Sequence, residues 1–225
     1  MSNQPVSNKV YRHAGNLPVL ALVPKQAATV LDVGCGAGDN ARCLRERGAT
    51  VDGITLSLME AELARNCCRE VWVHNLENGL PEEARGPYDA ALCSHVLEHL
   101  CFPQKLLADL HRALKPGGSL VVALPNMLFY RNRLKLLRGR VEYEEGGLMD
   151  ETHFRWYTFA SAQRLLENAG FMRVSAAGDG SLPLPGLRRI LPTGFLAPLD
   201  RTATRLLPGL FGFQLLYHYR KEAAA

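Results

Sequence analysis

The sequence predicts an α/β fold built on a doubly wound, mostly parallel sheet. Short apolar runs alternate with helix-compatible segments from Thr29 to about residue 177. The first run ends in a glycine-rich turn, and a helix-compatible segment, 41–47, follows at once. Parallel strands need crossover connections about as long as a helix, so this alternation indicates a sheet covered by helices on both faces.

The turn after the first strand is the most informative stretch. Gly34, Gly36 and Gly38 stand at every second position after Asp32. Glycine is favoured where the backbone φ is positive, or where a side chain would separate the main chain from a ligand. The N–H groups that open the next helix would face that ligand. The turn therefore predicts ligand contact, with an ordinary strand-to-helix turn as the alternative.

The stretch 29–40, TVLDVGCGAGDN, resembles motif I of the class I S-adenosylmethionine-dependent methyltransferases. Its spacing G-x-G-x-G differs from the G-x-G-x-x-G of nicotinamide-binding folds. The resemblance covers about residues 28–177, and its branch is similar to the methyltransferases of methionine biosynthesis and of glycan or quinone modification. It implies a Rossmann-like sheet of seven strands, the last antiparallel, with S-adenosylmethionine as the cofactor. It places Asp32 near the methionine end of the cofactor, and Gly34, Cys35, Gly36 and Gly38 beneath it.

The second strand, expected within 49–57, departs from the family pattern. Most relatives end this strand in an acid that takes both ribose hydroxyls, whereas Thr55 and Leu56 stand here. The ending G-I-T-L-S resembles that of the cyclopropane-fatty-acid synthases, in which a polar residue five positions later helps to bind the cofactor. That residue is Glu60 in this chain. We expect Thr55, Leu56 and Glu60 at the ribose, with a solvated glutamate as the alternative.

The third strand and the loop that leaves it are expected within 71–77. The family usually has an aspartate at the position of Asn75, where it accepts a hydrogen bond from the adenine amino group, and the backbone of Leu76 completes the contact. Asparagine keeps a carbonyl acceptor and loses the charge. We expect Asn75 and Leu76 at the adenine, with a simple Asx-type turn at Asn75 as the alternative.

The fourth strand, 88–93, runs directly into Ser94 and the segment 95–100, HVLEHL. The pattern H-x-x-E-H matches an inverted zincin signature, but a third ligand would have to come from a distant segment, and we expect no metal. The resemblance accounts for the run better, since methyltransferases often carry a similar L-E-H segment here. Ligands bind where the strand order reverses, so Ser94 and His95 are expected to face the glycine turn. His95 should open a helix, and Glu98 and His99 should brace the fold.

The substrate site is expected after the fifth strand, 120–124, which ends at Pro125 and Asn126. A helix over 103–114 and the stop signal K-P-G-G precede that strand. The later pattern D-x-x-H-x-R-W-Y-T resembles the region after strand five in small methyltransferases. We predict His153 as the catalytic base and His95 as the second candidate. The predicted substrate contacts are Tyr11, Asn126, Asp150, Arg155 and Trp156. A structural network that holds the loop, and a core tyrosine at position 11, are the alternatives.

The chain is expected to form one domain, 1–225. It comprises an N-terminal leader or lid (1–27), a cofactor-binding core (28–177), an apolar insertion (178–212) and a closing strand (213–220). The core is expected to end with a helix over 161–169 and a sixth strand over 171–177. The proline-punctuated, leucine-rich insertion must cover the core, a partner, a lipid-like substrate or a membrane surface. The basic stretch 131–140 is either a solvated helix or a grip for a phosphate or carboxylate.

Composition limits the class of protein. The 225 residues are 47% hydrophobic and 21% charged, which suits one globular domain. A formal net charge of +4 permits an anionic substrate and does not indicate nucleic acid. We find no apolar run long enough to span a membrane and no signal-peptide core, so we expect a cytoplasmic protein, with peripheral membrane contact left open. The six cysteines lack the spacing of a disulfide scaffold and are expected to be reduced.

The expected activity is transfer of a methyl group to an oxygen or nitrogen of a small-molecule or carrier-linked biosynthetic intermediate. An acceptor oxygen of high pKa would need a base, and imidazole is suited to that role. Carbon methylation of a lipid is a minor variant. The alternative is a regulatory or activating subunit that binds S-adenosylmethionine without transferring its methyl group. The sequence does not indicate the oligomeric state.

Overall fold

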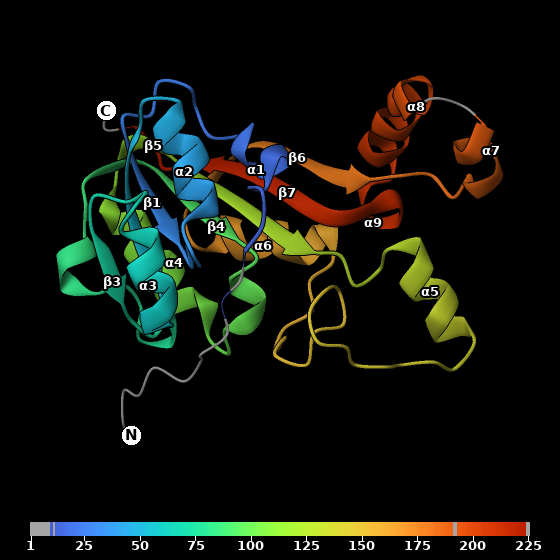
Figure 1. Ribbon diagram of the computed structural model, residues 1–225, viewed down its shortest axis with the longest axis horizontal. Coiled ribbons are helices and arrows are strands. Elements are labelled where there is room, and N and C mark those ends of the chain that lie inside the picture. Colours follow the sequence, from blue (N-terminus) through green and yellow to red (C-terminus); the bar gives the residue numbers. More distant parts are fainter. Residues whose placement is uncertain (1–9, 11, 191–192, 224–225) are drawn as a thin grey trace.

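A seven-stranded sheet forms the centre of the computed structural model, which describes residues 10, 12–190 and 193–223. The strands lie in the order β3-β2-β1-β4-β5-β7-β6. Neighbours from β3 to β5 are parallel, and β7 is antiparallel to both β5 and β6 (Figure 1). The predicted doubly wound sheet with an antiparallel last strand is confirmed. The strands are β1 Thr29–Val33, β2 Thr50–Thr55, β3 Val71–Val73, β4 Tyr88–Ser94, β5 Leu114–Pro125, β6 Met172–Gly180 and β7 Gly212–Arg220.

Helices cover both faces of the sheet. On one face α1, α2 and α3 pack on the core that includes Val30, Val51 and Leu92. On the other face α4 and α6 pack on the core that includes Leu31, Val122 and Tyr217. The helices are α1 Leu17–Leu20, α2 Asp39–Glu46, α3 Leu58–Ala64, α4 Pro103–Ala113, α5 Tyr130–Leu137, α6 Phe159–Asn168, α7 Pro185–Ile190, α8 Thr193–Leu206 and α9 Pro208–Phe211, with short 3-10 turns η1 Leu76–Asn78, η2 Glu82–Ala84 and η3 Leu97–His99.

The chain differs from the predicted elements in three places. The sequence predicts a helix over 58–68, whereas α3 ends at Ala64, because the backbone forms tight turns through Asn66 and Cys67. The strand β5 starts at Leu114 and takes in the K-P-G-G turn, where its register against β4 shifts. No helix starts at His95, whose φ of 58° is left-handed; a short 3-10 turn follows instead. That conformation is unusual for a residue other than glycine and turns the chain sharply at the end of β4.

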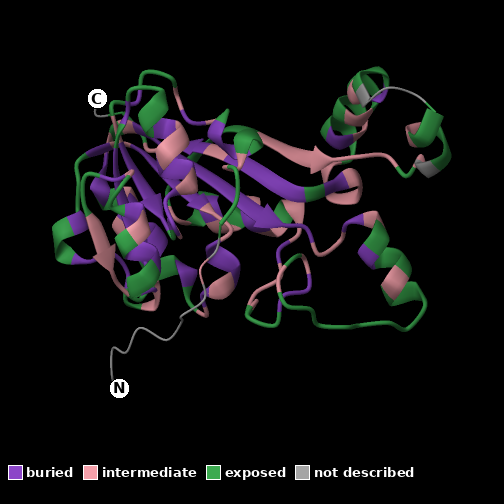
Figure 2. Ribbon diagram, viewed as in Figure 1, coloured by how far each residue is buried: buried purple, intermediate pink, exposed green. Residues whose placement is uncertain are grey.

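The connection between β6 and β7 and the segment around α5 extend beyond the sheet. Figure 1 shows α5, α7 and α8 on the side away from β3 and α3. Their residues are mostly exposed or intermediate (Figure 2), and Ile190, Phe195 and Leu206 keep 80%, 73% and 72% of their surface exposed. The predicted insertion is therefore helical, and much of its apolar surface is not covered by the described chain. No helix in the described ranges has the length and apolar character needed to cross a membrane.

Candidate functional site

The site lies at the carboxyl ends of β1 and β4, which are neighbours in the sheet. Their registered residues include Val33 and Cys93, so the glycine turn emerges beside Ser94 and His95. A Cβ atom built on Gly34 would lie 2.6 Å from Cγ2 of Val96, which leaves no room for a side chain on the turn at that position. The order of strands reverses at this point of the sheet. The glycine turn therefore faces the end of β4, as the sequence predicts.

Asp32 is a buried acid near the end of β1, two residues before the glycine turn. Its side chain is fully buried, and neither carboxylate oxygen has a hydrogen-bond partner among the described residues. Burial raises the pKa of Asp32 to about 7, because the charged form is poorly solvated there. Native proteins rarely leave such a group unpaired, and an orphaned carboxylate in a crevice indicates a place for a polar or cationic ligand group.

The glycine turn itself takes a left-handed backbone. The φ angles of Gly34, Gly36 and Gly38 are 71°, 54° and 86°. Gly38 precedes α2, and a Cβ atom on it would lie 3.0 Å from Cα of Ala64, so its packing on α3 requires glycine. The N–H of Cys35 donates to the carbonyl of Ile54, and its thiol is buried. Of the three glycines, Gly34 and Gly38 are thus required by packing within the protein, and the positive φ of Gly36 also favours glycine.

The end of β2 forms a compact polar group. Thr55 and Glu60 are both buried, and the Thr55 hydroxyl donates to Oε2 of Glu60 over 2.6 Å. Ser57 caps α3 by accepting from the Glu60 N–H. Leu56 between them keeps 41% of its surface exposed. Glu60 thus reaches back to the strand end, where most relatives have an acid, and the alternative of a solvated glutamate is wrong.

The loop after β3 contains an Asx-type turn at Asn75, which was the alternative to a contact with adenine. Its side-chain oxygen accepts from the N–H of Glu77 over 3.0 Å and caps η1. Asn75 is exposed, whereas Leu76 is half-buried against the core. The contact of both residues with adenine stays a prediction, since the Asx turn uses one acceptor site of the Asn75 amide and leaves its N–H groups for other partners.

A hydrogen-bond network joins the leader to the end of β4 and to β7. The amide of Asn16 donates to the hydroxyl of Ser94 and to Oε1 of Gln214. Gln214 is buried, and its amide donates to Asp179 over 2.7 Å, which fixes its orientation. The backbone N–H of Asn16 donates to Asn40 in α2. No local pattern indicated Gln214, because its partners are distant along the chain.

His95 sits between two acceptors. Its Nε2 lies 3.1 Å from Oε1 of Gln214, and its Nδ1 lies 3.3 Å from Oε1 of the buried Glu98. Burial by itself lowers the pKa of His95, but these two acceptors raise it above its ordinary value. Its side chain keeps 38% of its surface exposed. His95 is therefore an oriented imidazole that remains accessible at the crevice.

His153, the first candidate base, lies deeper. Only 5% of its side-chain surface is exposed, and it packs between the rings of His99 and Trp156. Burial lowers the pKa of His153, and the nearby carboxylate of Glu98 offsets only part of that lowering. Arg155 donates to the carbonyl of Cys101 over 2.7 Å and is not paired with Asp150. The catalytic role of His153 and the substrate contact of Trp156 stay predictions.

Two further predicted substrate residues, Asn126 and Asp150, have partners within the protein. Asn126 is fully buried and its amide donates to the carbonyls of Gly209 and Gly212, while its oxygen accepts from Leu128. Asp150 is also buried and accepts from the backbone and hydroxyl of Thr152. We therefore leave both out of the proposed substrate site. Tyr11 lies outside the described residues.

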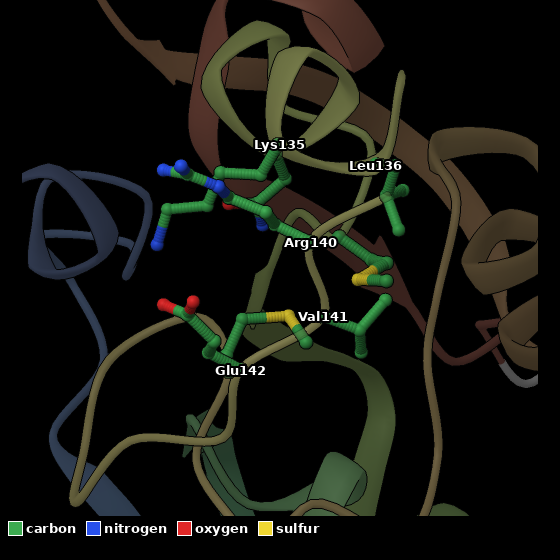
Figure 3. A pocket seen from close by; sticks show the side chains of 8 residues that line it. Lys135, Leu136, Arg140, Val141 and Glu142 are labelled. Atoms are coloured by element: carbon green, nitrogen blue, oxygen red, sulfur yellow. The ribbon is translucent and has the colours of Figure 1, made fainter. Parts of the chain in front are cut away.

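The basic stretch lies away from this crevice. Figure 3 shows a pocket beside α5 in which the nitrogens of Lys135 and Arg140 point to the same side as the carboxylate of Glu142. Lys135 also pairs with Glu144 over 3.0 Å. A second pocket, of about 310 Å³, is lined by Tyr130, Arg131, Leu182, Pro183, Leu184 and Arg188. The acids that follow α5 therefore balance part of its positive charge.

Comparison with known proteins decides the family. The sequence model described as "Methyltransferase domain" matches residues 9–176. The chain belongs to this methyltransferase-domain family. The predicted family, a methyltransferase domain, is confirmed by this membership. The matched residues contain the glycine turn, Asp32, Glu60 and His95.

Individual relatives agree with the family assignment. The methyltransferase domain is 34% identical over 110 residues to the ubiquinone biosynthesis O-methyltransferase of Pseudomonas paraeruginosa, covering 44% of each protein. It is 30% identical over 171 residues to the protein of that name from Chromobacterium violaceum, covering 69% of each. The matched part spans only about half the length of most such curated relatives. The structure of an S-adenosylmethionine-dependent methyltransferase from Thermotoga maritima has the same fold, with a TM-score of 0.64 and 22% sequence identity. The match covers 91% of this chain and 86% of the Thermotoga chain.

The residues of the crevice fit the cofactor of the family. The orphaned carboxylate of Asp32 suits an ammonium group, and the left-handed backbone at Gly36 lets the main chain approach a ligand closely. Glu60 and Thr55 place a carboxylate and a hydroxyl at the next strand end, where a diol would find hydrogen-bond partners. The donor set therefore agrees with a ligand that carries both an amino acid and a ribose.

Proposed function

We propose that this methyltransferase domain transfers the methyl group of S-adenosylmethionine to a hydroxyl oxygen of a small-molecule or carrier-linked biosynthetic intermediate. The observation that carries the proposal is the oriented, accessible imidazole of His95 beside the glycine turn. An oxygen acceptor needs a base, whereas a neutral amine needs little help, so a positioned imidazole favours oxygen. The printed names of the curated relatives, ubiquinone biosynthesis O-methyltransferases, support the same choice.

The cofactor would be held by three groups of residues. Asp32 would take the methionine ammonium group, and Gly34 and Gly36 would lie beneath the methionine part. Glu60, supported by Thr55, would accept from the ribose hydroxyls. Asn75 and Leu76 would meet the adenine. The cofactor supplies an electrophilic methyl group, and the protein contributes alignment and exclusion of water.

His95 would hold and move the proton of the acceptor. Its Nδ1 faces the buried carboxylate of Glu98, which keeps the Nδ1 proton in place and orients the ring. Its Nε2 is then the nitrogen that takes the proton from the hydroxyl of the acceptor, in place of its contact with Gln214. General-base catalysis of this kind contributes roughly a hundredfold to ten-thousandfold to the rate.

The test is release of S-adenosylhomocysteine from S-adenosylmethionine on three acceptors: an ortho-diphenol, a simple phenol and a primary amine. We expect turnover on a hydroxyl acceptor, and loss of at least about a hundredfold in kcat/KM in His95→Gln. Turnover confined to the amine would overturn the oxygen assignment. Tight cofactor binding without release on any acceptor of a broader panel would favour the regulatory subunit instead.

A further inference from the structure

Glu98, His99 and His153 come together just beyond the carboxyl end of β4. One ligand atom from each lies within 4.8 Å of the other two. Glu98 and His99 belong to η3, and His153 belongs to the segment between α5 and α6. The N–H groups of Phe154 and Arg155 both donate to the backbone carbonyl of Glu98, over 2.9 and 3.0 Å. The backbone therefore holds the two segments in this arrangement without help from the three side chains.

The carboxylate of Glu98 is fully buried and has few partners. Its Oε1 lies 3.3 Å from Nδ1 of His95, the contact that orients that ring, and 4.0 Å from Nε2 of His153. Its Oε2 has no hydrogen-bond partner among the described residues. A buried carboxylate is destabilising unless it is paired and hydrogen-bonded. An ion bound at Oε2 would supply the missing partner.

The two imidazole rings are close neighbours, and one of them has partners on its outer side. The rings of His99 and His153 lie with their centroids 4.7 Å apart. Nδ1 of His99 is 3.2 Å from the carbonyl oxygen of Thr152 and 3.0 Å from its hydroxyl, and that hydroxyl donates to Asp150. Contacts of this kind fix the ring of a metal-binding histidine and set its tautomer.

We propose that Glu98, His99 and His153 bind one divalent transition-metal ion, with Zn²⁺ the best match to the donor set. Two imidazoles and one carboxylate form a three-ligand site that leaves at least one coordination position open. The sequence expectation of no metal rested on the need for a ligand from a distant segment and on the better fit of the family resemblance. The fold brings such a ligand, His153, from 54 residues away to Glu98 and His99. The ion would fix the 150–156 segment to the end of β4.

The test uses the full chain, treated with a chelator and then titrated with Zn²⁺ and with Co²⁺. We expect one ion per chain by calorimetry, with a micromolar or tighter dissociation constant, and a higher melting temperature in the presence of the ion. Bound Co²⁺ should give visible absorption bands without the near-ultraviolet bands of thiolate ligation, which separates this site from the six cysteines.

Three variants decide the assignment. His99→Gln and His153→Gln should each weaken Zn²⁺ binding by about tenfold or more, on the order of the loss known for ligand-shell changes. The control is His111→Gln in α4, where the ring packs on Phe171, and it should bind Zn²⁺ as the wild type does. His99 is half-exposed, so its variant should fold even if the deeper His153 variant does not. Binding that is equally tight in His99→Gln, or absent in the wild type at millimolar Zn²⁺, would overturn the proposal.

Discussion

Thr55 and Glu60 form a buried hydrogen bond at the end of β2, with the threonine hydroxyl donating to Oε2 over 2.6 Å. The side chain of Glu60 starts in the first turn of α3 and reaches back to the strand. A carboxylate therefore reaches the end of β2, although the strand itself ends in a threonine. The acid at this strand end therefore comes from Glu60 of α3 and not from the last residue of the strand.

We predict that Glu60→Gln weakens the binding of S-adenosylmethionine by about tenfold or more, because a charge-assisted hydrogen bond is worth about 1.5 to 3 kcal/mol. The change keeps the size of the side chain, and the Thr55 hydroxyl still has an oxygen to donate to. The measurement is calorimetry with the cofactor. The control is Glu62→Gln, an exposed acid of the same helix, which should bind normally. Equal affinity in both variants would remove Glu60 from the cofactor site.

We predict that Asp32→Asn stabilises the ligand-free protein at pH 8 and not at pH 4. An acid whose pKa rises on folding contributes stability at low pH and loses it as the pH passes through the folded value, here about 7. Removing the charge should raise the melting temperature by several degrees at pH 8. The same variant should bind S-adenosylmethionine about tenfold or more weakly. A variant less stable than the wild type at pH 8 would show that the carboxylate is already well solvated or paired.

Local patterns predicted the elements that position the cofactor. The turn from Gly34 to Gly38, the acid at Asp32 and the order of strands and helices follow from periodicity and glycine spacing, which act over a few residues. The Asx turn at Asn75 was also predictable as an alternative, since asparagine caps such turns by itself.

Partners that are distant in sequence were not predictable. Nothing near Gln214 indicates that it meets Asn16 and His95, which are 198 and 119 residues away. The carbonyls of Gly209 and Gly212, which accept from the Asn126 amide, are also distant, at 83 and 86 residues along the chain. Such contacts depend on how β5, β6 and β7 lie together, which a single sequence does not encode in any local pattern.

We predict that Gly36→Val abolishes cofactor binding while the protein still folds. A β-branched side chain at a φ of 54° is strained, and its Cβ would stand where the main chain meets the ligand. The matched control is Gly139→Val, which has a φ of 69° and no atom within 4 Å of a built Cβ. Both variants should lose a similar amount of stability in thermal melts, and only the first should lose binding. If the control also fails to bind, the loss at Gly36 reports strain and not contact.

The last prediction separates His95 from His153 as the base, and it is measured on chelator-treated protein so that no ion is bound to Glu98 or His153. The pKa of His95 is raised by Glu98 and Gln214, so its neutral form accumulates only above the ordinary imidazole value of about 6.5. The wild-type kcat/KM should therefore rise with pH through a pKa above 6.5, because a base acts only when unprotonated. The pKa of the more deeply buried His153 is lowered, and a base there would make kcat/KM rise below pH 6.5.

In Glu98→Gln the rise in kcat/KM should move to lower pH, since the carboxylate that stabilises the charged His95 ring is gone. In His95→Gln the rise should disappear along with most of the activity, while calorimetry still shows cofactor binding. A rise below pH 6.5 that survives in His95→Gln would return the role to His153.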